Sequence, residues 1–430
     1  MTEISFETLK LSKTTLKAIA KKNFKFASEI QAKIIPLIFE GKKDVIGVAQ
    51  TGTGKTGAFG LPLVDLINKG NKVPQALILA PTRELALQVT SELNFFAGEK
   101  RLKILCVYGG ASMATQIKAL KEGVDIVVGT PGRIVDLINR KELKLSAVQY
   151  LVLDEADEML KMGFIEDLEF IFEQTSPKRR VYLFSATMPE RIKNLSKKYM
   201  HKQEYIEVKR NETTSLNIEQ SFYKVKQSEK FEALAKIIAS EKFFYGIIFC
   251  RTKADVDTIA SKLRRVSSGV ASIHGDVPQR KREKLLEKFR KQDLQILVAT
   301  DVAARGIDVE NLTHVINFNL PEDLETYTHR IGRTGRAGKK GKAVSLVTPA
   351  ELRRISILEK GLKTKIACKK LEGKANLENL REKNLSFEIE KLLERTQGEE
   401  YFSLAEELVK NYPPFKVVAA LLQDRERNKR

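Results

Sequence analysis

The 430-residue chain contains no tryptophan, and it has only three cysteines and four histidines. The cysteines, Cys106, Cys250 and Cys368, lie far apart, so they make neither a disulfide framework nor a closely spaced metal-binding pair. The histidines are isolated as well, and no zinc site is predicted. This use of cysteine indicates a reducing compartment.

Long apolar runs are also absent. No segment approaches the roughly 20 apolar residues that span a bilayer, and the N-terminus lacks the basic and apolar regions of a signal peptide. We therefore predict no membrane association and a cytoplasmic location. Acidic residues are outnumbered, since 75 lysines and arginines oppose 55 aspartates and glutamates, for a net charge of +20. Because neither end carries a basic amphipathic anchor, this excess favours nucleic acid as the partner.

Short apolar segments alternate with longer amphipathic segments over most of the chain. This pattern is typical of parallel strands that helices cover on both faces of a sheet. A polar stretch interrupts the alternation, which then resumes. The sequence predicts an α/β domain over residues 1–208, a linker over 209–217 and a second α/β domain over 218–360. The predicted strands are 44–49, 76–80, 104–108, 125–129, 150–153 and 181–184, then 246–250, 296–300, 314–318 and 342–347.

Residues 361–430 are predicted to form a small helical extension without strands. Apolar residues at helical spacing predict helices over 386–395 and 415–422. A further helix is expected to begin with a capping box of Ser403 and Glu406 and to stop at residues 412–414. The last helix is too apolar to stand alone in water, so it packs on the second domain as a cap or on another copy of the chain.

A phosphate-binding loop is predicted where a buried strand meets a helix. Backbone N–H groups of such a glycine loop and of the helix N-terminus surround a polyphosphate. Lys55 would place its ammonium on the outer phosphates of ATP, and Thr56 would offer a hydroxyl to Mg²⁺. The alternative is a glycine turn with an incidental lysine. The residues expected around the phosphates are Thr51, Gly52, Thr53, Gly54, Lys55 and Thr56.

A group of acidic residues, 154–157, follows the apolar segment 150–153. Carboxylates at the carboxyl end of a central strand face the ligand crevice of such a sheet. Asp154 is predicted to hold Mg²⁺, and Glu155 to orient and deprotonate the water that attacks the γ-phosphate. Taken alone, the four residues also fit the solvated start of a helix, but the phosphate loop before them favours the catalytic interpretation.

A series of short motifs in the chain resembles, in order, the motifs of the DEAD-box family of superfamily 2 RNA helicases. The resemblance extends from about residue 6 to residue 350. Chance accounts for one such motif but not for the whole ordered set. The motifs are 26–31, 49–56, 81–86, 109–110, 130–133, 154–157, 185–187, 247–252, 274–282, 299–308 and 329–336.

The resemblance implies two tandem RecA-like domains that close on ATP and RNA together. The implied activity is that of an RNA-dependent ATPase that separates RNA duplexes locally. Gln31 would pair with adenine, whose donor and acceptor atoms a carboxamide matches. Phe26 would contact the adenine face, with a core phenylalanine as the alternative, and Asp308 would contact the ribose.

Other residues take their roles from the same resemblance. Arg333 and Arg336 match the arginine fingers, which stabilise charge that grows on the γ-phosphoryl group. Because they lie far from the phosphate loop in sequence, the ATP site is expected to be split across a cleft. The residues expected to couple this site to domain closure are Asp157, Ser185, Thr187 and His329.

Candidate RNA-binding residues fall at or beside turns after predicted strands. Their guanidinium, hydroxyl and backbone donors suit phosphates and 2′-hydroxyls rather than base edges. Binding should therefore be largely independent of base sequence and sensitive to salt. With 7% aromatics, extended base stacking is not expected to dominate. A structural salt bridge or cap is the alternative for each residue alone, and the family match identifies the set: Arg83, Gly110, Thr130, Arg133, Arg251, Thr252, Arg282 and Thr300.

The chain departs from the family pattern before the phosphate loop, where the family has Gly-Phe and then Pro. These positions are Asn23, Phe24 and Ala27 here. Asparagine tolerates a left-handed backbone, so the turn is expected to survive, but without proline the loop is less pre-set. Nucleotide affinity is the property that this change affects.

Other functions fit part of the sequence. Thr252-Lys-Ala-Asp255 resembles the guanine-selecting string of GTPases, although it lies about 200 residues from the phosphate loop. A DNA helicase would share the two-domain ATPase, and an ATP-gated RNA clamp would share every motif. Similarity to bacterial family members with a dimerisation region also implies a homodimer through residues 361–430, and ribosome-assembly or RNA-degradation partners.

Overall fold

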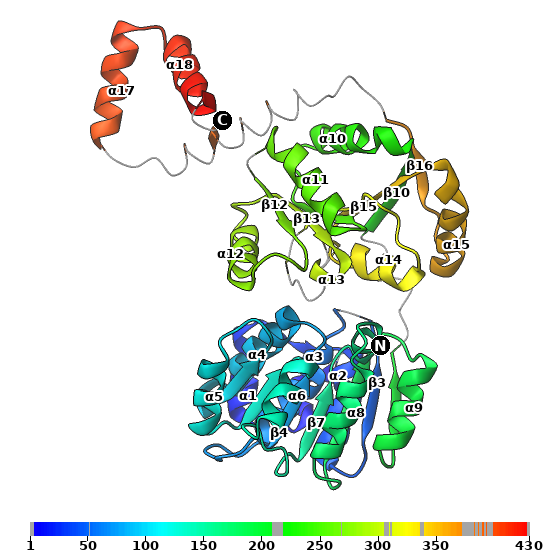
Figure 1. Cartoon of the computed structure of the whole chain (residues 1–430). Coiled ribbons are helices and arrows are strands. Elements are labelled where there is room, and N and C mark those ends of the chain that lie inside the picture. The colour runs from blue at the N-terminus through cyan, green and yellow to red at the C-terminus, as the bar shows by residue number, and fades with distance from the viewer. Residues whose placement is uncertain are drawn as a thin grey trace.

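The computed structural model describes residues 4–50, 52–208, 218–267, 269–304, 309, 312–335, 339–371 and 399–427, with isolated positions between 382 and 393. It contains two α/β domains and a pair of C-terminal helices (Figure 1). The predicted linker, 209–217, and most of the predicted helix 386–395 lie outside the described residues. Within the described chain, no helix is long and apolar enough to cross a membrane.

The first domain is built on a seven-stranded sheet in which every pairing is parallel, with the strand order β5-β6-β4-β7-β8-β3-β9. Its strands are β3 (Val45–Val48), β4 (Ala76–Leu79), β5 (Ile104–Val107), β6 (Ile126–Gly129), β7 (Tyr150–Leu153), β8 (Arg180–Ser185) and β9 (Glu204–Glu207). Its helices are α1 (Lys13–Lys21), α2 (Glu29–Glu40), α3 (Lys55–Leu66), α4 (Arg83–Ala97), α5 (Met113–Lys121), α6 (Pro131–Asn139), α7 (Ala156–Lys161), α8 (Ile165–Gln174) and α9 (Glu190–Tyr199).

Both faces of this sheet are buried, which explains why its central strands are continuously apolar. Successive side chains of a strand point to opposite faces. In β4, Ala76 and Ile78 accordingly pack in one core and Leu77 and Leu79 in the other. All four are fully buried. The edge strand β9 instead alternates partly buried and exposed residues, and its apolar signal was too weak to predict it.

The second domain repeats this architecture with a seven-stranded parallel sheet in the order β12-β13-β11-β14-β15-β10-β16. Its strands are β10 (Ile218–Lys224), β11 (Gly246–Cys250), β12 (Val270–Ile273), β13 (Ile296–Thr300), β14 (His314–Asn317), β15 (Gly341–Val347) and β16 (Ala367–Lys369). Its helices are α10 (Lys230–Ser240), α11 (Lys253–Arg264), α12 (Gln279–Arg290), α13 (Asp301–Ala304), α14 (Leu324–Ile331) and α15 (Leu352–Leu362). The predicted fold class, two tandem RecA-like domains, is confirmed.

One strand contradicts the expectation that strands end near residue 361. β16 pairs in parallel with β10 and extends the second sheet beyond the predicted boundary of that domain. All three of its residues are exposed, so it carries no buried apolar pattern that sequence reasoning could detect. Any truncation that spares the second domain must therefore leave residues 367–369 in place.

The C-terminal helices differ from their predicted limits. α17 (Glu399–Asn411) begins before Ser403, so the predicted capping box at that residue is wrong, because Ser403 lies inside the helix. α17 ends just before Tyr412, as the Pro-Pro pair predicted. α18 (Pro414–Arg427) extends further than predicted, and the two helices contact each other.

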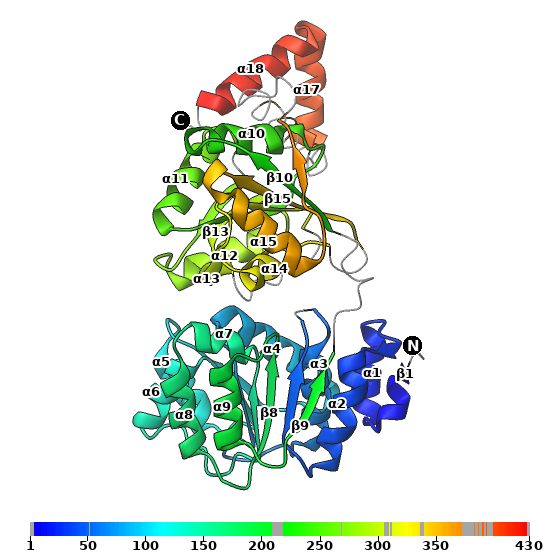
Figure 2. The ribbon, with the colours of Figure 1, turned by 90° about the vertical axis from the view of Figure 1, so that its right-hand side faces the viewer.

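A small antiparallel pair of strands, β1 (Ile4–Ser5) and β2 (Phe26–Ala27), connects the N-terminus to the segment before α2. Asn23 has a φ of 57°, so the turn at this departure from the family pattern adopts the left-handed backbone that asparagine tolerates. The two domains lie one above the other in both views (Figures 1 and 2), and contacts between them join α4 to α12 and α7 to α14.

Candidate active site between the two domains

The phosphate loop connects the buried strand β3 to α3, which begins at Lys55. Gly52 and Gly54 have φ values of 84° and 90°, a left-handed backbone that favours glycine. The Lys55 side chain is buried, and its Nζ has no hydrogen-bond partner among the described residues. A buried ammonium that lacks a partner, beside a helix N-terminus, fits a phosphate group. Thr51 lies outside the described residues.

Gln31 packs directly against this loop. Its Nε2 donates a hydrogen bond to the Gly54 carbonyl at 3.0 Å, and its Oε1 accepts one from the Ser28 N–H at 3.0 Å. A Cβ atom at Gly54 or Gly57 would lie 2.5 or 2.6 Å from Nε2 of Gln31, so a side chain at either position would displace the Gln31 carboxamide. Phe26 is 47% exposed, which rules out the alternative that it is a core residue.

The acidic residues lie where the central strand β7 ends. Asp154 is 2% exposed, and burial raises the pKa of its carboxyl to about 7, although Lys55 opposes the shift. The Asp154 carboxylate accepts a hydrogen bond from the Glu155 N–H at 3.0 Å. Glu155 has a φ of 52°, a strained conformation for this residue, and it forms the N-cap of α7. The backbone thus turns sharply at the predicted catalytic carboxylate.

Asp157 joins α7 to the loop after β8. Its Oδ2 accepts hydrogen bonds from the Thr187 N–H at 2.8 Å, from the Thr187 hydroxyl at 2.9 Å and from the Ala186 N–H at 3.1 Å. Its own N–H donates to Oγ of Ser185 at 3.2 Å. The Thr187 hydroxyl also lies 3.4 Å from Oε1 of Glu325 in the second domain. Three of the predicted coupling residues therefore form one network at the domain interface.

His329, the fourth predicted coupling residue, lies on α14 of the second domain. Its Nδ1 is 3.3 Å from Oε1 of Glu158 in the first domain. Arg333 follows the end of α14 and lines a small cavity together with His329 and Asp301. Arg336 and Asp308 lie outside the described residues.

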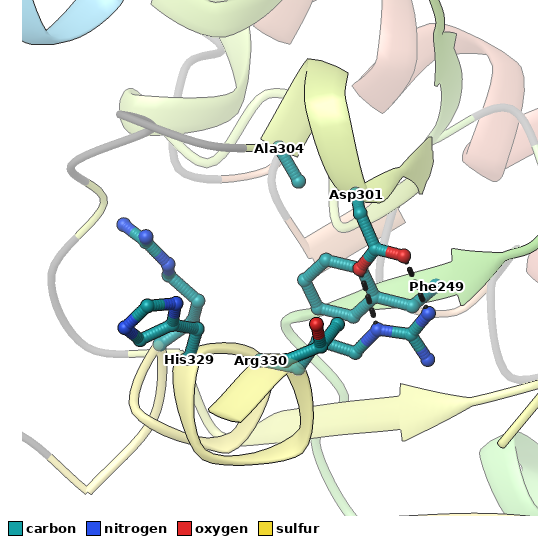
Figure 3. Close-up of a pocket in the computed structure, with 7 residues that line it drawn as sticks. Phe249, Asp301, Ala304, His329 and Arg330 are labelled. Carbon is teal, nitrogen blue, oxygen red and sulfur yellow. Dashed lines mark hydrogen bonds and ion pairs between the residues drawn. The ribbon is translucent and has the colours of Figure 1, made fainter. Parts of the chain in front are cut away.

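Sequence reasoning did not single out Arg330 and Asp301, which position α14, although both lie inside motifs that the sequence showed. The buried Arg330 guanidinium pairs with Asp301 through two contacts, at 2.6 and 2.7 Å. It also donates to Oδ1 of Asn317 and to the Asn319 carbonyl, and it lies over the Phe249 ring. Figure 3 shows Arg330 and Asp301 facing each other beside Phe249, with His329 apart from them. This anchoring fixes α14 to its own domain.

Arg83, a predicted RNA-binding residue of the first domain, contacts the second domain at another part of the interface. Nη1 of Arg83 donates to Oε1 of Gln279 at 2.8 Å. Next to it, the buried Glu84 pairs with Nε of Arg282 at 2.9 Å. Burial raises the pKa of Glu84, and the charge of Arg282 opposes this shift. Gly110, with a φ of 89°, approaches the Arg83 guanidinium.

The remaining candidates are placed by turns and caps. Thr130 is the N-cap of α6, and Nη1 of Arg133 donates to Oε1 of Gln116 at 2.9 Å. Arg251 pairs with Glu322 on the surface, and Thr300 is the last residue of β13. Arg133 and Arg282 are thus held by protein groups, as the structural alternative for single residues allowed.

Thr252 explains the string that resembled a GTPase motif. Its Oγ1 accepts a hydrogen bond from the Asp255 N–H at 3.1 Å, and Asp255 accepts one from the Thr252 N–H at 3.3 Å. The two residues form a capping box at the start of α11. This role accounts for the threonine and the aspartate without a guanine base.

Two family models match the chain, one for each domain. The model described as DEAD/DEAH box helicase matches residues 28–195, and the model described as Helicase conserved C-terminal domain matches residues 229–338. The fold and the interdomain site define a two-domain nucleotide-dependent helicase. The chain belongs to the DEAD-box helicase family.

Particular relatives cover nearly the whole chain. It is 45% identical over 422 residues to the DEAD-box ATP-dependent RNA helicase CshA of Geobacillus kaustophilus, which covers 97% of this chain and 90% of that protein. Among solved structures, a DEAD box protein from Methanococcus jannaschii matches with 48% identity and a TM-score of 0.51, covering 86% of this chain and 99% of that one. Dbp5 of S. cerevisiae, bound to RNA and ADP BeF3, matches with 31% identity and a TM-score of 0.78, covering 86% and 96%.

Proposed function

We propose that this protein is an RNA-dependent ATPase and ATP-dependent RNA helicase that separates RNA duplexes locally as its two domains close. One observation carries the proposal: the Asp157 network in the first domain reaches α14 of the second domain through Thr187 and Glu325. The helix that precedes Arg333 therefore contacts the loop after β8, and Asp157 joins that loop to the helix that begins just after the predicted catalytic carboxylate. Similarity to relatives named as ATP-dependent RNA helicases supports the same activity.

The arrangement of the domains supports closure on both ligands. The chain matches Dbp5 bound to RNA and ADP BeF3 better than it matches the more identical protein from Methanococcus jannaschii. Each protein has the same two-domain fold, so a better match over the whole chain favours a similar placement of the domains. Polar contacts across the interface, such as those of Arg282 and Glu325, fit this placement.

The residues around the phosphate loop fit ATP with Mg²⁺. The buried Nζ of Lys55 would contact the outer phosphates, and Gln31 would face the adenine side, with Phe26 exposed nearby. Thr56 and Asp154 would hold Mg²⁺, which supplies positive charge to the phosphates when bound. Glu155 would accept the proton of the attacking water, and Arg333 and Arg336 would stabilise the γ-phosphoryl charge.

RNA would contact guanidinium, hydroxyl and backbone groups on both domains. Among the arginines predicted to bind RNA, Arg251 is the most exposed, and its partner Glu322 is also exposed. Exchange of this surface ion pair for a phosphate costs little, because exposed pairs contribute only about 0 to 1 kcal/mol. Arg83 and Arg282 each contact the opposite domain, so strand binding at these residues and closure would favour each other.

The C-terminal helices carry an apolar surface that suits a second copy of the chain. Tyr401, Leu404 and Leu408 are spaced along one face of α17, and Phe415, Val418 and Leu421 along one face of α18. All six are at least 36% exposed, Leu408 being the least exposed of them. We propose a homodimer through this surface.

Other parts of the proposal rest on sequence. The three cysteines are free and lie far apart in the sequence, so they form no disulfide bond of the kind that proteins of oxidising compartments use. This supports a cytoplasmic location. RNA-bearing complexes of ribosome assembly or RNA degradation are the proposed partners. Competition between labelled complexes of these two classes in a pull-down would identify which one binds.

The activity is tested by ATP hydrolysis at low salt with single-stranded RNA, duplex RNA with an overhang, or DNA of the same sequence. RNA should raise the rate by roughly 10²-fold or more, because an arginine delivered by closure contributes roughly 10³ to 10⁵ in comparable NTPases. Glu155→Gln is the control, as it should bind ATP and lose turnover. An unchanged rate with RNA would contradict the proposal. Equal stimulation by DNA would favour the DNA helicase, and slow turnover without strand separation would favour the clamp.

A further inference from the structure

A cluster of charged side chains joins α7 of the first domain to α14 of the second, beside the predicted catalytic residues. Lys161, the last residue of α7, places its Nζ 2.6 Å from Oε1 of Glu325 and 3.3 Å from Oε1 of Glu158. Glu325 lies in the first turn of α14. The contact between Lys161 and Glu325 therefore crosses the domain interface.

The same carboxylate also reaches the coupling network. Oε1 of Glu325 lies 3.4 Å from the Thr187 hydroxyl, which donates to Asp157 at 2.9 Å. One turn further along α14, His329 lies 3.3 Å from Glu158. Glu325 and His329, one turn apart on α14, thus contact Lys161 and Glu158 of α7. A helix held at both positions cannot rotate about its axis.

α14 transmits this position to Arg333 because it is rigidly attached to its own domain. Arg330 is bound on both sides by Asp301 and by groups of the β14 segment. Arg333 follows the end of α14 by two residues. A shift of Glu325 relative to Lys161 would therefore move the start of the arginine-finger segment relative to Glu155, the N-cap of α7. Rate falls steeply when reacting groups are displaced even by about 1 Å.

The cluster holds an ammonium rather than a metal ion. Ligand atoms of Glu158, Glu325 and His329 lie within 4.8 Å of one another, a spacing that a divalent cation could use. Nζ of Lys161 already contacts both carboxylates. Burial alone would lower the pKa of Lys161, but the hydrogen bond to Glu325 and the charges of Glu158 and Glu325 raise it above its ordinary value. The lysine is therefore charged at neutral pH and supplies the cation.

We propose that Lys161 and Glu325 form an interdomain positioning pair, which holds α14 and Arg333 in register with the Asp157–Thr187 network when the domains close. The proposal rests on the helicase function proposed above. Neither residue touches a reacting group, so the pair would act on domain closure and on the rate of hydrolysis after closure. Nucleotide binding to the first domain would not depend on it.

The test compares Lys161→Met, Glu325→Gln and the exchange variant Lys161→Glu/Glu325→Lys with the unchanged protein. The exchange keeps the net charge of the cluster, because positions 161 and 325 still hold one acidic and one basic residue beside Glu158. Each single variant should raise the RNA concentration for half-maximal ATPase and lower kcat, each by roughly three- to tenfold, the effect of one partly exposed charged contact. The affinity of a fluorescent nucleotide without RNA should stay the same, and the exchange should recover most of the loss.

The matched control is Lys236→Met. Lys236 is 29% exposed, close to the 33% of Lys161, and it pairs with Glu232 at 2.8 Å within α10. This variant should leave both RNA half-saturation and kcat unchanged. Fluorescence energy transfer between dyes on the two domains, with RNA and a non-hydrolysable ATP analogue, gives a second readout that needs no turnover. The closed fraction should fall in both single variants and recover in the exchange.

Three results would overturn the pair. The first is that the single variants have the same RNA half-saturation and kcat as the unchanged protein. The second is a loss of activity that the exchange variant does not recover. The third is a loss of activity of equal size in Lys236→Met. Because Lys161 and Glu325 are partly exposed, the variants are expected to fold. If Lys161→Met is unstable, Lys161→Arg replaces it in the test, and this variant should retain most activity because it keeps the charge. Absence of RNA-stimulated ATPase in the unchanged protein would refute the proposed function itself, whichever way the variants behave.

Discussion

At the scale of single residues, burial decides the charge state of the groups that would hold the nucleotide. Lys55 and Asp154 are both almost fully buried, and the charge of Lys55 favours the charged form of Asp154. The carboxyl of Asp154 still has its pKa raised to about 7, because burial outweighs the attraction of one ammonium. Added positive charge from Mg²⁺ would bring that pKa down.

This charge state predicts a pH dependence of nucleotide binding. Because the protonated carboxyl is a poor cation ligand, the affinity for the Mg²⁺-nucleotide should fall by up to about tenfold per pH unit below a pH near 7 and level off above it. The measurement is titration of a fluorescent nucleotide between about pH 5.5 and 8.5.

The Asp154→Asn variant serves as the control for this measurement. It keeps the titration of the nucleotide phosphates but removes that of the carboxyl, so the difference between the two proteins isolates Asp154. Identical pH profiles for both proteins would contradict the predicted role of this residue.

At the scale of elements, α14 connects the second domain to the site. Its charged anchor within that domain is Arg330, whose guanidinium meets Asp301, Asn317 and Asn319, while the neighbouring His329 faces the other domain. One helix therefore presents a structural residue and an interdomain residue side by side. The sequence motif that contains both gives no indication of which residue does which.

We expect Arg330→Met to destabilise the second domain by about 3 kcal/mol, at the lower end of the range for a broken buried pair, because Asp301 keeps 30% of its side chain exposed. Denaturant unfolding would measure this change. Arg353→Met is the control, because Arg353 is exposed on α15 and should have little effect. Equal stability of the two variants would show that α14 is anchored by other contacts.

At the scale of the whole molecule, two features lie beyond either domain alone. The domains meet through separate sets of polar contacts, one containing Glu84 and Arg282 and the other Lys161 and Glu325. The C-terminal helices add an apolar surface that the described part of the chain leaves exposed. Closure and self-association are accordingly expected to be independent, because different residues carry them.

Self-association predicts a particle mass near twice the 48.6 kDa of one chain. The combined variant Leu404→Glu/Leu421→Glu should reduce it to that of a monomer, because charges on an apolar interface are strongly disfavoured. Light scattering after size-exclusion chromatography measures the mass, and RNA-stimulated ATPase should be retained. A truncation after residue 371 is the matched control, since it keeps β16 in the second sheet. A monomeric unchanged protein would refute the dimer.

Much of the fold could be predicted because its signals are local. Residues 76–79 and 126–129 are continuously apolar, and the strands form at those places because both faces of the sheet are covered. The phosphate loop was equally visible, since Gly52 and Gly54 are required by their backbone conformation. Of the four edge strands of the two large sheets, β5 was predicted, and β9, β12 and β16 were not. β9 and β16 bury little, and an exposed strand needs only a neighbour with free backbone groups, which leaves no pattern in its side chains.

The amino-acid sequence by itself determined the order of the strands along the chain, the nucleotide loop and the acidic residues that follow β7, because each depends on residues close together in the chain. Only the tertiary structure decided which side chains face each other across the interface. Glu84 and Arg282, or Lys161 and Glu325, meet because the two domains face each other through helices that follow the carboxyl ends of their strands. Contacts of this kind depend on the relative placement of whole domains, and no short segment contains that information.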